Sequence, residues 1–458
     1  MAVQDQITSV GAGAYQGYFK RDVPREDPEL THVGSGTAMG EYLRRFWQPV
    51  CMSEDLADLP KAIRIMGEDL VAFRDKSDQI GVLHRHCSHR GTSLEYGIVS
   101  ERGLRCCYHG WLFDADGTIL DTPGEPPNSK LKDSFRHGAY PAREEGGLIF
   151  AYMGPTELQP DFPVFDGYDL WDTRMKSFEV TFPCNWLQVT DNYVDPIHSM
   201  FLHSSYASTQ LTESFLLRPY CHFFETPGGS GITHSTTRRT TGELVWNRMN
   251  HAVTPNIGEL GSPWEEGLEP ALFRRVYATR WSVPIDDMNT VMFGWRHLND
   301  FVDPWSKADE GGIGKNMVDF DAQVARPTYE AGQRDPGDWE ALTAQRPIAV
   351  HAAENLGSTD VGVQARRRML RQVLNGERGD LLPPPADGES RPIRTFSQDT
   401  TLRIPRRPDR NEDWALLGEV GRRINDAIAA ADHLRGEDRQ IFVERRLAEV
   451  EAELGSGP

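Results

Sequence analysis

Cysteine is scarce in this chain, which has only six cysteines among 458 residues. So few cysteines in so long a chain do not form the dense disulfide framework of small secreted domains. The segment from Met1 to Val10 has no basic region followed by an apolar run. No later stretch approaches the roughly 20 apolar residues of a membrane span. We therefore expect a protein of the reducing cytoplasm, with no membrane partner.

Positive charge is also in short supply, because 49 Lys and Arg face 68 Asp and Glu, for a net charge of −19. This balance disfavours nucleic acid and anionic membrane surfaces as partners. A nucleotide-binding loop is missing as well. Gly34-Ser35-Gly36 resembles half of such a loop, but no apolar strand precedes it. The chain therefore offers no visible flavin or nicotinamide site of its own.

Two short segments between Cys87 and His109 carry candidate metal ligands. Cys87-Ser88-His89 is followed, after sixteen residues, by Cys106-Cys107-Tyr108-His109. Each segment offers a Cys and a His, whereas a zinc finger usually groups its cysteines and its histidines separately. This arrangement favours a two-iron cluster with both thiolates on one iron and both imidazoles on the other. A structural zinc is the alternative, and the spacing alone leaves both Cys106 and Cys107 open as the second thiolate.

A second group of candidate ligands follows in the stretch from Asp195 to His203. His198 and His203 would lie about 140° apart on a regular helix, so a shared metal needs a π-bulge, a wound-out turn or a break. Pro196 favours such a distortion. Two imidazoles and one carboxylate form the facial triad of non-haem Fe(II) oxygenases. The alternatives are two unrelated histidines on a packed helix and, for Asp195, a helix N-cap before Pro196.

Together these motifs resemble those of the catalytic (alpha) subunit of Rieske non-haem iron aromatic-ring-hydroxylating oxygenases. The resemblance rests on Cys-x-His, Cys-x-x-His with Gly110-Trp111 after it, and the later Asp-x-x-His-x-x-x-x-His. Gly36-Thr37-Ala38, Cys106-Cys107 and Asn185-Trp186-Leu187-Gln188 are similar to the phthalate dioxygenase branch.

The resemblance and the pattern of short strands imply an α+β protein. An N-terminal all-β Rieske [2Fe-2S] domain would precede a helix-grip catalytic domain, which is an antiparallel sheet with helices. The predicted divisions are an N-terminal arm at 1–36, the Rieske domain at 37–160, the mononuclear iron catalytic domain at 161–410 and a C-terminal helical extension at 411–458.

The resemblance also implies which residues form each site. The cluster ligands would be Cys87, His89, Cys106 and His109, with Cys107 as a neighbouring thiol. The mononuclear iron would be held by His198, His203 and a later carboxylate. Asp195 would bridge His109 of one subunit to an iron-ligating histidine of the next.

The later carboxylate is best matched by Asp338. Asp338-Trp339 precedes Pro347-Ile348, and Glu354 to Asp360 matches a further run that the branch carries. Gly337 departs from the pattern, since relatives tend to have Gln or Glu there. Asp338 would otherwise cap the short helix that it opens. The other candidates for this ligand are Asp360, Glu354, Asp319 and Asp321.

The function implied by the resemblance is that of a terminal oxygenase component. It would use O₂ to hydroxylate (mono- or dioxygenate) or O-demethylate a small aromatic compound, in particular an aromatic acid. Electrons would come from NAD(P)H through a separate flavin and iron–sulfur reductase, and the chain would form trimers or stacked trimers. The alternatives are a Rieske electron-transfer or redox-sensing protein and a zinc-stapled binding protein. Candidate clamps for a substrate carboxylate are Arg218, Arg238, Arg239, Arg248 and Arg280.

Apolar periodicity and turn residues predict the elements between these motifs. A helix is expected from Thr37 to Pro49, with Trp47 on its apolar face, and the stretch 185–203 is expected to be helical. Strands are expected at 62–66, 70–74, 80–84, 147–153 and 176–182, and hairpins at 216–239 and 274–297. Further helices are expected at 338–345, 358–374 and 414–454.

Overall fold

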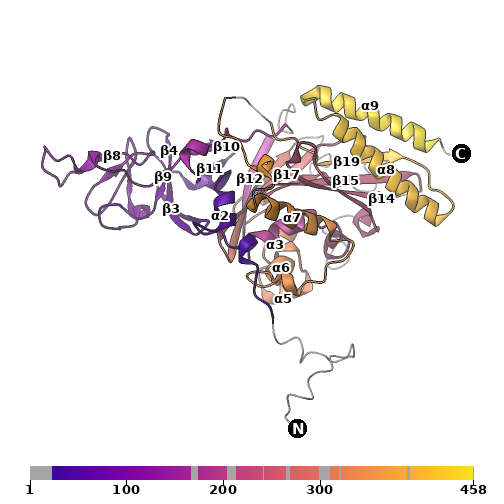
Figure 1. Cartoon of the computed structure of the whole chain (residues 1–458), viewed down its shortest axis with the longest axis horizontal. Helices are drawn as coiled ribbons and strands as arrows, with labels where there is room; N and C mark the ends of the chain where they lie inside the picture. Colours follow the sequence, from indigo (N-terminus) through magenta and orange to yellow (C-terminus); the bar gives the residue numbers. More distant parts are fainter. Residues whose placement is uncertain are drawn as a thin grey trace, which may run out of the picture.

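The computed structural model describes residues 23–166, 174–203, 213–240, 242–264, 269–298, 310–318, 321–388 and 392–456. Most of the predicted N-terminal arm, including Tyr15, Tyr18 and Phe19, lies outside these residues. Within them the chain forms four antiparallel sheets, three small and one large. In Figure 1 the small sheets lie at one end of an elongated molecule, and the C-terminal helices lie at the other.

The three small sheets make up the N-terminal domain. The first consists of β1 (Trp47–Met52), β11 (Leu148–Tyr152) and β10 (Ala142–Glu145). The second has the order β2 (Lys61–Ile65), β3 (Glu68–Arg74), β4 (Ile80–His84) and β9 (Ala139–Tyr140). The third has the order β5 (Ile98–Val99), β6 (Leu104–Arg105), β7 (Leu112–Phe113) and β8 (Ile119–Asp121). Two short helices, α1 (Pro28–Thr31) and α2 (Ala38–Leu43), precede them.

One eight-stranded sheet forms the centre of the second domain. Its strand order is β12 (Arg174–Phe182), β18 (Asn289–Leu298), β17 (Val276–Asp286), β16 (Ile257–Gly261), β15 (Leu244–Val253), β14 (Gly231–Arg239) and β13 (Tyr220–Glu225), and β19 (Gln398–Arg403) also pairs with β15. The large sheet and the all-β domain before it confirm the predicted α+β architecture.

Helices cover the large sheet in two groups (Figure 1). One group lies below the sheet and comprises α3 (Trp186–Asp191), α5 (Tyr329–Arg334), α6 (Asp338–Thr343) and α7 (Val361–Leu374), and the short helix α4 (His198–Phe201) follows α3 in the chain. The other group consists of α8 (Arg410–Ala430) and α9 (Gly436–Gly455), which pack over β13, β14 and β19. None of the described helices combines the length and the apolar character that crossing a membrane requires.

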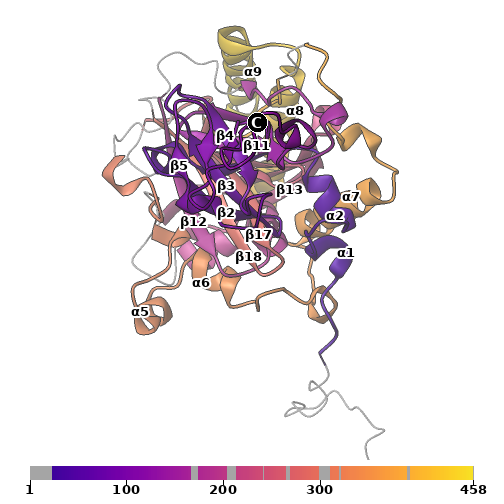
Figure 2. The ribbon, with the colours of Figure 1, turned by 90° about the vertical axis from the view of Figure 1, so that its left-hand side faces the viewer.

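The two domains share one hydrophobic core. The ring of Phe150 in β11 packs against Trp281 of β17 and Trp295 of β18, with ring centroids 5.5 Å and 5.8 Å away. The Trp295 indole N–H donates to the Gly146 carbonyl at 2.8 Å, which satisfies its polar group inside the contact. Figure 2 shows β3 and β11 in front of β17 and β18. The two domains on either side of the predicted boundary near residue 160 therefore pack against each other. The position of that domain boundary stays a prediction.

Two predicted helices differ from the structure. The first ends at Leu43, and Trp47 begins strand β1 instead of lying on a helical face. Pro49 is tolerated there because β1 is an edge strand whose register shifts next to it. The predicted helix at 414–454 is instead two helices, α8 and α9. The break between them lets their apolar faces pack against each other, which one continuous helix could not do. Their facing residues include Val420, Ile424, Val443 and Leu447, which are buried together.

Candidate metal centres

The four cluster candidates lie in two loops of the small sheets. Cys87 and His89 follow β4, and Cys106 and His109 lie between β6 and β7. Both cysteines are 3% exposed. Each loop closes on its own backbone, since the Gly91 N–H donates to Cys87 O at 2.8 Å and the Gly110 N–H to Cys106 O at 3.1 Å. Cys107, in contrast, is exposed, so the fold favours Cys106 as the second thiolate.

The side chains in these loops are arranged in like pairs. The rings of His89 and His109 are 4.5 Å apart, and the two cysteine thiols are neighbours. His89 also stacks on Trp111 at 4.6 Å with an interplanar angle of 6°. Its Nδ1 is buried without a hydrogen-bond partner, which is unusual for a buried polar atom and fits a metal ligand. Burial and the neighbouring Cys106 raise the pKa of Cys87 to about 11, so a thiolate there needs a bound cation.

The spacing of these donor atoms separates a cluster from a single zinc ion. A tetrahedral zinc with bonds of about 2.0–2.3 Å would hold all four donors within roughly 4 Å of one another. Among the described residues, the donor atoms of His198, His203 and Asp338 converge to within 4.8 Å of one another. That group does not include the four cluster candidates. The pairing of thiol with thiol and of imidazole with imidazole fits a two-iron cluster, with one pair on each iron.

The two histidines of the second group approach each other because the helix that carries them widens into a π-helical turn. Helix α3 ends at Asp191, and Asp195 is extended with φ −103° and ψ 104°, as expected for a residue before proline. A new helix then starts at His198, and the chain widens into a π-helical turn at His203. The two imidazoles consequently approach each other, with ring centroids 5.2 Å apart.

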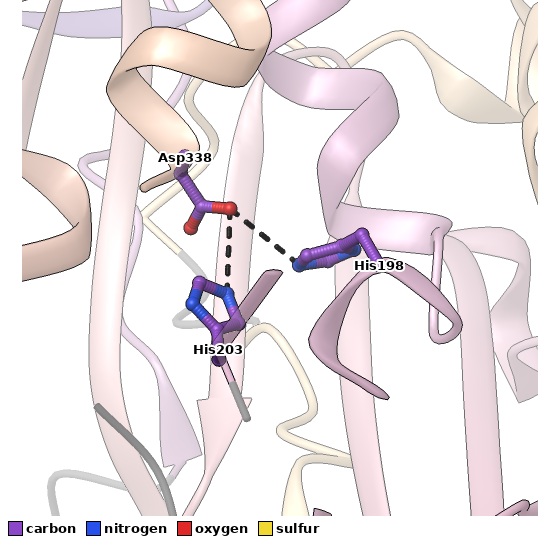
Figure 3. A group of neighbouring side chains, drawn as sticks. All are labelled: His198, His203 and Asp338. Atoms are coloured by element: carbon purple, nitrogen blue, oxygen red, sulfur yellow. Dashed lines mark ion pairs between the residues drawn. The ribbon is translucent and has the colours of Figure 1, made fainter. Parts of the chain in front are cut away.

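Asp338 completes this group from the first residue of α6 (Figure 3). Its Oδ1 lies 3.4 Å from His203 Nε2 and 3.6 Å from His198 Nε2. Burial alone would raise the pKa of Asp338, but the charges of His203, His198 and Arg280 outweigh it and lower the pKa. The carboxyl group is therefore ionised, as a metal ligand must be. The trio presents two imidazoles and one carboxylate, the ligand set that non-haem Fe(II) sites use.

Asp195 contacts both its own backbone and His198. One oxygen, Oδ1, accepts hydrogen bonds from the N–H groups of Ile197 at 2.9 Å and His198 at 3.4 Å. The other, Oδ2, lies 3.5 Å from His198 Nδ1. Asp195 therefore holds the turn that precedes α4 and also faces the histidine, although the N-cap residue of α4 itself is Ile197. A carboxylate on the far nitrogen of a ligating imidazole fixes its tautomer. The predicted contact of Asp195 with a second subunit stays a prediction.

Sequence reasoning missed two amides around this trio. Gln323 Nε2 donates a hydrogen bond to Asp338 Oδ2. Asn192 Nδ2 lies 3.3 Å from Asp338 Oδ1 and 3.4 Å from His198 Nε2. Asn192 lies three residues before Asp195, where its closeness to the motif is a signal, whereas nothing in the sequence pattern singles out Gln323.

Gly337 explains how Gln323 reaches the site. A Cβ at this position would lie 2.7 Å from both the Cα and the carbonyl oxygen of Ala322. A side chain there, as in the pattern of the branch, would push Ala322 and its neighbour Gln323 away from α6. The departure at Gly337 is therefore compatible with Asp338 as a ligand.

The other candidates for the third ligand lie elsewhere or cannot be placed. Asp360 accepts the Gly357 N–H at 2.6 Å at the start of α7, and Glu354 pairs with Arg367. The side chains of Asp319 and Asp321 lie outside the described residues.

A pocket adjoins the trio on the face of the large sheet. Its walls combine the trio with side chains of β14, β15 and β17 and with apolar groups. Residues that line it include His234, Arg238, Arg248, Asn250, Tyr277, Arg280, Phe215 and Leu260. The two metal centres are remote within one chain, because sheet β5–β8 lies at the far end of the molecule from α3 and α6 (Figure 1).

Comparisons with known proteins agree with this geometry. A family model described as Rieske [2Fe-2S] domain matches residues 46–136. The chain is 42% identical to the tert-butanol monooxygenase / tert-amyl alcohol desaturase oxygenase subunit of Aquincola tertiaricarbonis, over 99% of this chain and 100% of the relative. It is 36% identical to the phenoxybenzoate dioxygenase subunit alpha of Ectopseudomonas oleovorans, over 76% of this chain and 84% of the relative.

Solved structures show the same fold. Dicamba monooxygenase bound to 3,6-dichlorosalicylic acid superimposes with a TM-score of 0.56 and 18% identity, covering 74% of this chain and 99% of that structure. Proteins that are 42% and 36% identical over most of their length share one family. This chain therefore belongs to the oxygenase subunits of the Rieske non-haem iron oxygenases, enzymes that use a Rieske [2Fe-2S] cluster and a mononuclear iron with O₂.

Proposed function

We propose that this chain is the terminal oxygenase of a multicomponent system that hydroxylates or O-demethylates a small aromatic compound, with an aromatic acid as the favoured class. The observation that supports it is the buried group of His198, His203 and Asp338 at the wall of a pocket. The relative named for phenoxybenzoate favours an aromatic acid. The relative named for tert-butanol makes a small tertiary alcohol the competing class.

The residues have separate roles in this proposal. Cys87, His89, Cys106 and His109 would hold the Rieske cluster, and His198, His203 and Asp338 would hold the mononuclear iron. When bound, that iron supplies the place where O₂ is reduced. Asp195 would keep the proton on Nδ1 of His198, so that Nε2 stays free to ligate. The pocket would orient the substrate and exclude water.

The distance between the two centres in one chain supports a proposal about assembly. We propose a trimer or stacked trimers in which His109 of one copy meets Asp195 of the next. His109 is partly exposed, and the Asp195 side chain is 33% exposed, so both can be approached from outside. A separate flavin and iron–sulfur reductase would supply electrons from NAD(P)H, and the cytoplasm stays the predicted location.

Iron content tests this function against an electron carrier. The oxygenase should contain about three irons per chain, whereas a carrier with the cluster alone should contain about two. Asp338→Ala should lower the content to about two and leave the visible absorption of the cluster unchanged. Asp360→Ala is the matched control and should keep about three. Two irons in the parent protein, with no substrate-dependent NADH and O₂ consumption in the presence of a reductase, would refute the proposal.

A further inference from the structure

The structure sorts the five candidate arginines into two groups. Arg239 pairs with Asp413 at 2.6 Å, and Arg218 is exposed and stacks on Trp414 at 4.9 Å. Neither of them lines the pocket beside the trio. Arg238, Arg248 and Arg280 do line it, and they reach it from strands β14, β15 and β17.

None of these three guanidinium groups has a carboxylate among the described residues within 4.0 Å. Arg238 donates to Leu217 O at 3.2 Å and to Thr236 Oγ1 at 2.8 Å. The Nε of Arg248 donates to Gly261 O at 2.9 Å. Arg280 is 3% exposed, and its Nε and Nη1 are buried without any hydrogen-bond partner.

This lack of partners is costly, because a buried charge is stable only when it is paired. The same fold pairs buried arginines elsewhere, as in the contacts of Arg274 with Asp399 at 2.9 Å and of Arg439 with Asp166 at 2.6 Å. Burial lowers the pKa of Arg238 to about 9 and that of Arg248 to about 10, yet both remain cationic at neutral pH. Asp399, opposite Arg248 in the register, is already bonded to Arg274, and Asp338 faces the two histidines, so neither acid forms an ion pair with these three arginines.

Arg248 lies between the other two arginines of the pocket, because its charge is repelled by Arg280 and itself repels Arg238. Arg280 lies against the ring of Tyr193 at 4.4 Å and acts on the charge of Asp338, so it belongs to the metal end. Arg238 and Arg248 lie 5.2 Å and 5.5 Å from the ring of Phe215 and repel each other. The sheet register explains this second pair.

Thr236 of β14 is paired with Arg248 of β15, and Arg238 is two residues further along the same face of β14. The pair therefore lies side by side on the sheet, with the apolar wall of Phe215 next to it. Such a site holds two positive charges, neither of them in an ion pair among the described residues, beside an aromatic surface suited to a ring.

We propose that Arg238 and Arg248 bind the carboxylate of an arenecarboxylate substrate, with its ring against Phe215. This inference rests on the proposed function and deepens it, because it selects the aromatic acid over the neutral tertiary alcohol. Guanidinium groups match a carboxylate by paired N–H donors, and a neutral ligand would leave both charges unpaired in the filled pocket. Arg280 adds positive potential at the metal end without contacting the carboxylate.

Binding of benzoate and its neutral isostere benzamide to the intact, metal-loaded protein tests the proposal. Isothermal titration calorimetry should show benzoate, phthalate or 4-methoxybenzoate binding at least about tenfold more tightly than the corresponding amide. Arg248→Met should weaken carboxylate binding about 10- to 100-fold and leave amide binding within about threefold. Arg218→Met, which removes an exposed guanidinium outside the pocket, is the matched control and should change neither.

A loss of structure is distinguished from a loss of the clamp by cluster absorption and iron content, which Arg248→Met should preserve. Arg248→Lys keeps the positive charge but loses the paired N–H donors of the guanidinium. This variant should retain part of the preference for binding the acid over the amide. The inference is overturned if no carboxylate of the panel binds, if amides or tert-butanol bind as tightly, or if Arg248→Met keeps the parental preference.

The proposed function can fail separately from this inference. Oxygenation of neutral arenes without any preference for acids would overturn the clamp and leave the oxygenase in place. Tight, Arg248-dependent carboxylate binding without any oxygenated product would overturn the proposed function and leave the clamp.

Discussion

Gln323 donates a hydrogen bond from Nε2 to one oxygen of Asp338, while the other oxygen faces both histidines of the trio. The two oxygens are thereby given different tasks, since Oδ2 is held by the amide and Oδ1 is directed at the metal position. A carboxylate held in this way favours binding through one oxygen, which leaves more coordination positions open for O₂ and substrate.

Gln323→Leu should weaken metal binding by about 10- to 100-fold, because it removes the group that orients Asp338. Titration of the mononuclear site with Co(II), followed by its visible d–d absorption, measures this affinity without turnover. Gln345→Leu, an exposed substitution just after α6, is the control and should bind Co(II) like the parent. Unchanged Co(II) affinity in Gln323→Leu would contradict this role.

Asp195→Asn should separate the structural role of this residue from its electrostatic role. Asparagine still accepts the N–H groups of Ile197 and His198, so the melting temperature should stay close to that of the parent. The negative charge beside His198 Nδ1 is lost, and turnover should fall by about tenfold or more. Parental turnover would rule out any role for the charge. A collapse of the melting temperature would show that asparagine does not replace the structural role of Asp195.

Cys106→Ser and Cys107→Ser should differ sharply, although the residues are neighbours. Cys106 is 3% exposed next to Cys87, whereas Cys107 is exposed to solvent. Cys106→Ser should abolish the visible absorption of the cluster and remove about two irons per chain. Cys107→Ser should keep both. The opposite pattern would move the second thiolate to Cys107.

Stability should decrease as the pH falls below about 6.5, partly because of His297. Burial, and then the charge of Arg296, lower the pKa of His297 to about 3, whereas an unfolded histidine has a pKa of about 6.5. Between these values the unfolded chain binds the additional proton, so the free energy of unfolding decreases with decreasing pH. Protonation of His297 in the unfolded chain alone should lower the free energy of unfolding at pH 5 by on the order of 2 kcal/mol relative to pH 7.5.

Urea unfolding at pH 7.5 and pH 5 measures this effect. His297→Gln should reduce the difference between the two pH values, whatever its effect on stability at pH 7.5. His433→Gln, at an exposed position between α8 and α9, is the control and should keep the parental difference. An equal pH dependence in His297→Gln and the parent would show that His297 titrates alike in both states.

Local patterns were sufficient where the ligands lie close together in the chain. Cys87 and His89 share one loop, Cys106 and His109 share the next, and His198 and His203 are five residues apart. The strands β2, β3, β4, β12 and β18 were also predicted close to their observed bounds, because turn residues mark their ends. The exact path between His198 and His203 was left open, and the structure shows a helix that widens into a π-helical turn at His203.

Residue order was sufficient to predict the two sets of candidate metal ligands and the order of an all-β domain before an α+β domain, because spacing and periodicity are local properties. Three-dimensional contacts were needed to show that Gln323 holds Asp338, that Arg239 forms an ion pair while Arg238 and Arg248 form none among the described residues, and that β19 joins β15. These facts depend on contacts between segments that are far apart in the chain or on which face of a strand is buried. Burial and pairing in three dimensions, which residue order does not specify, decide which charged groups stay free to bind a ligand.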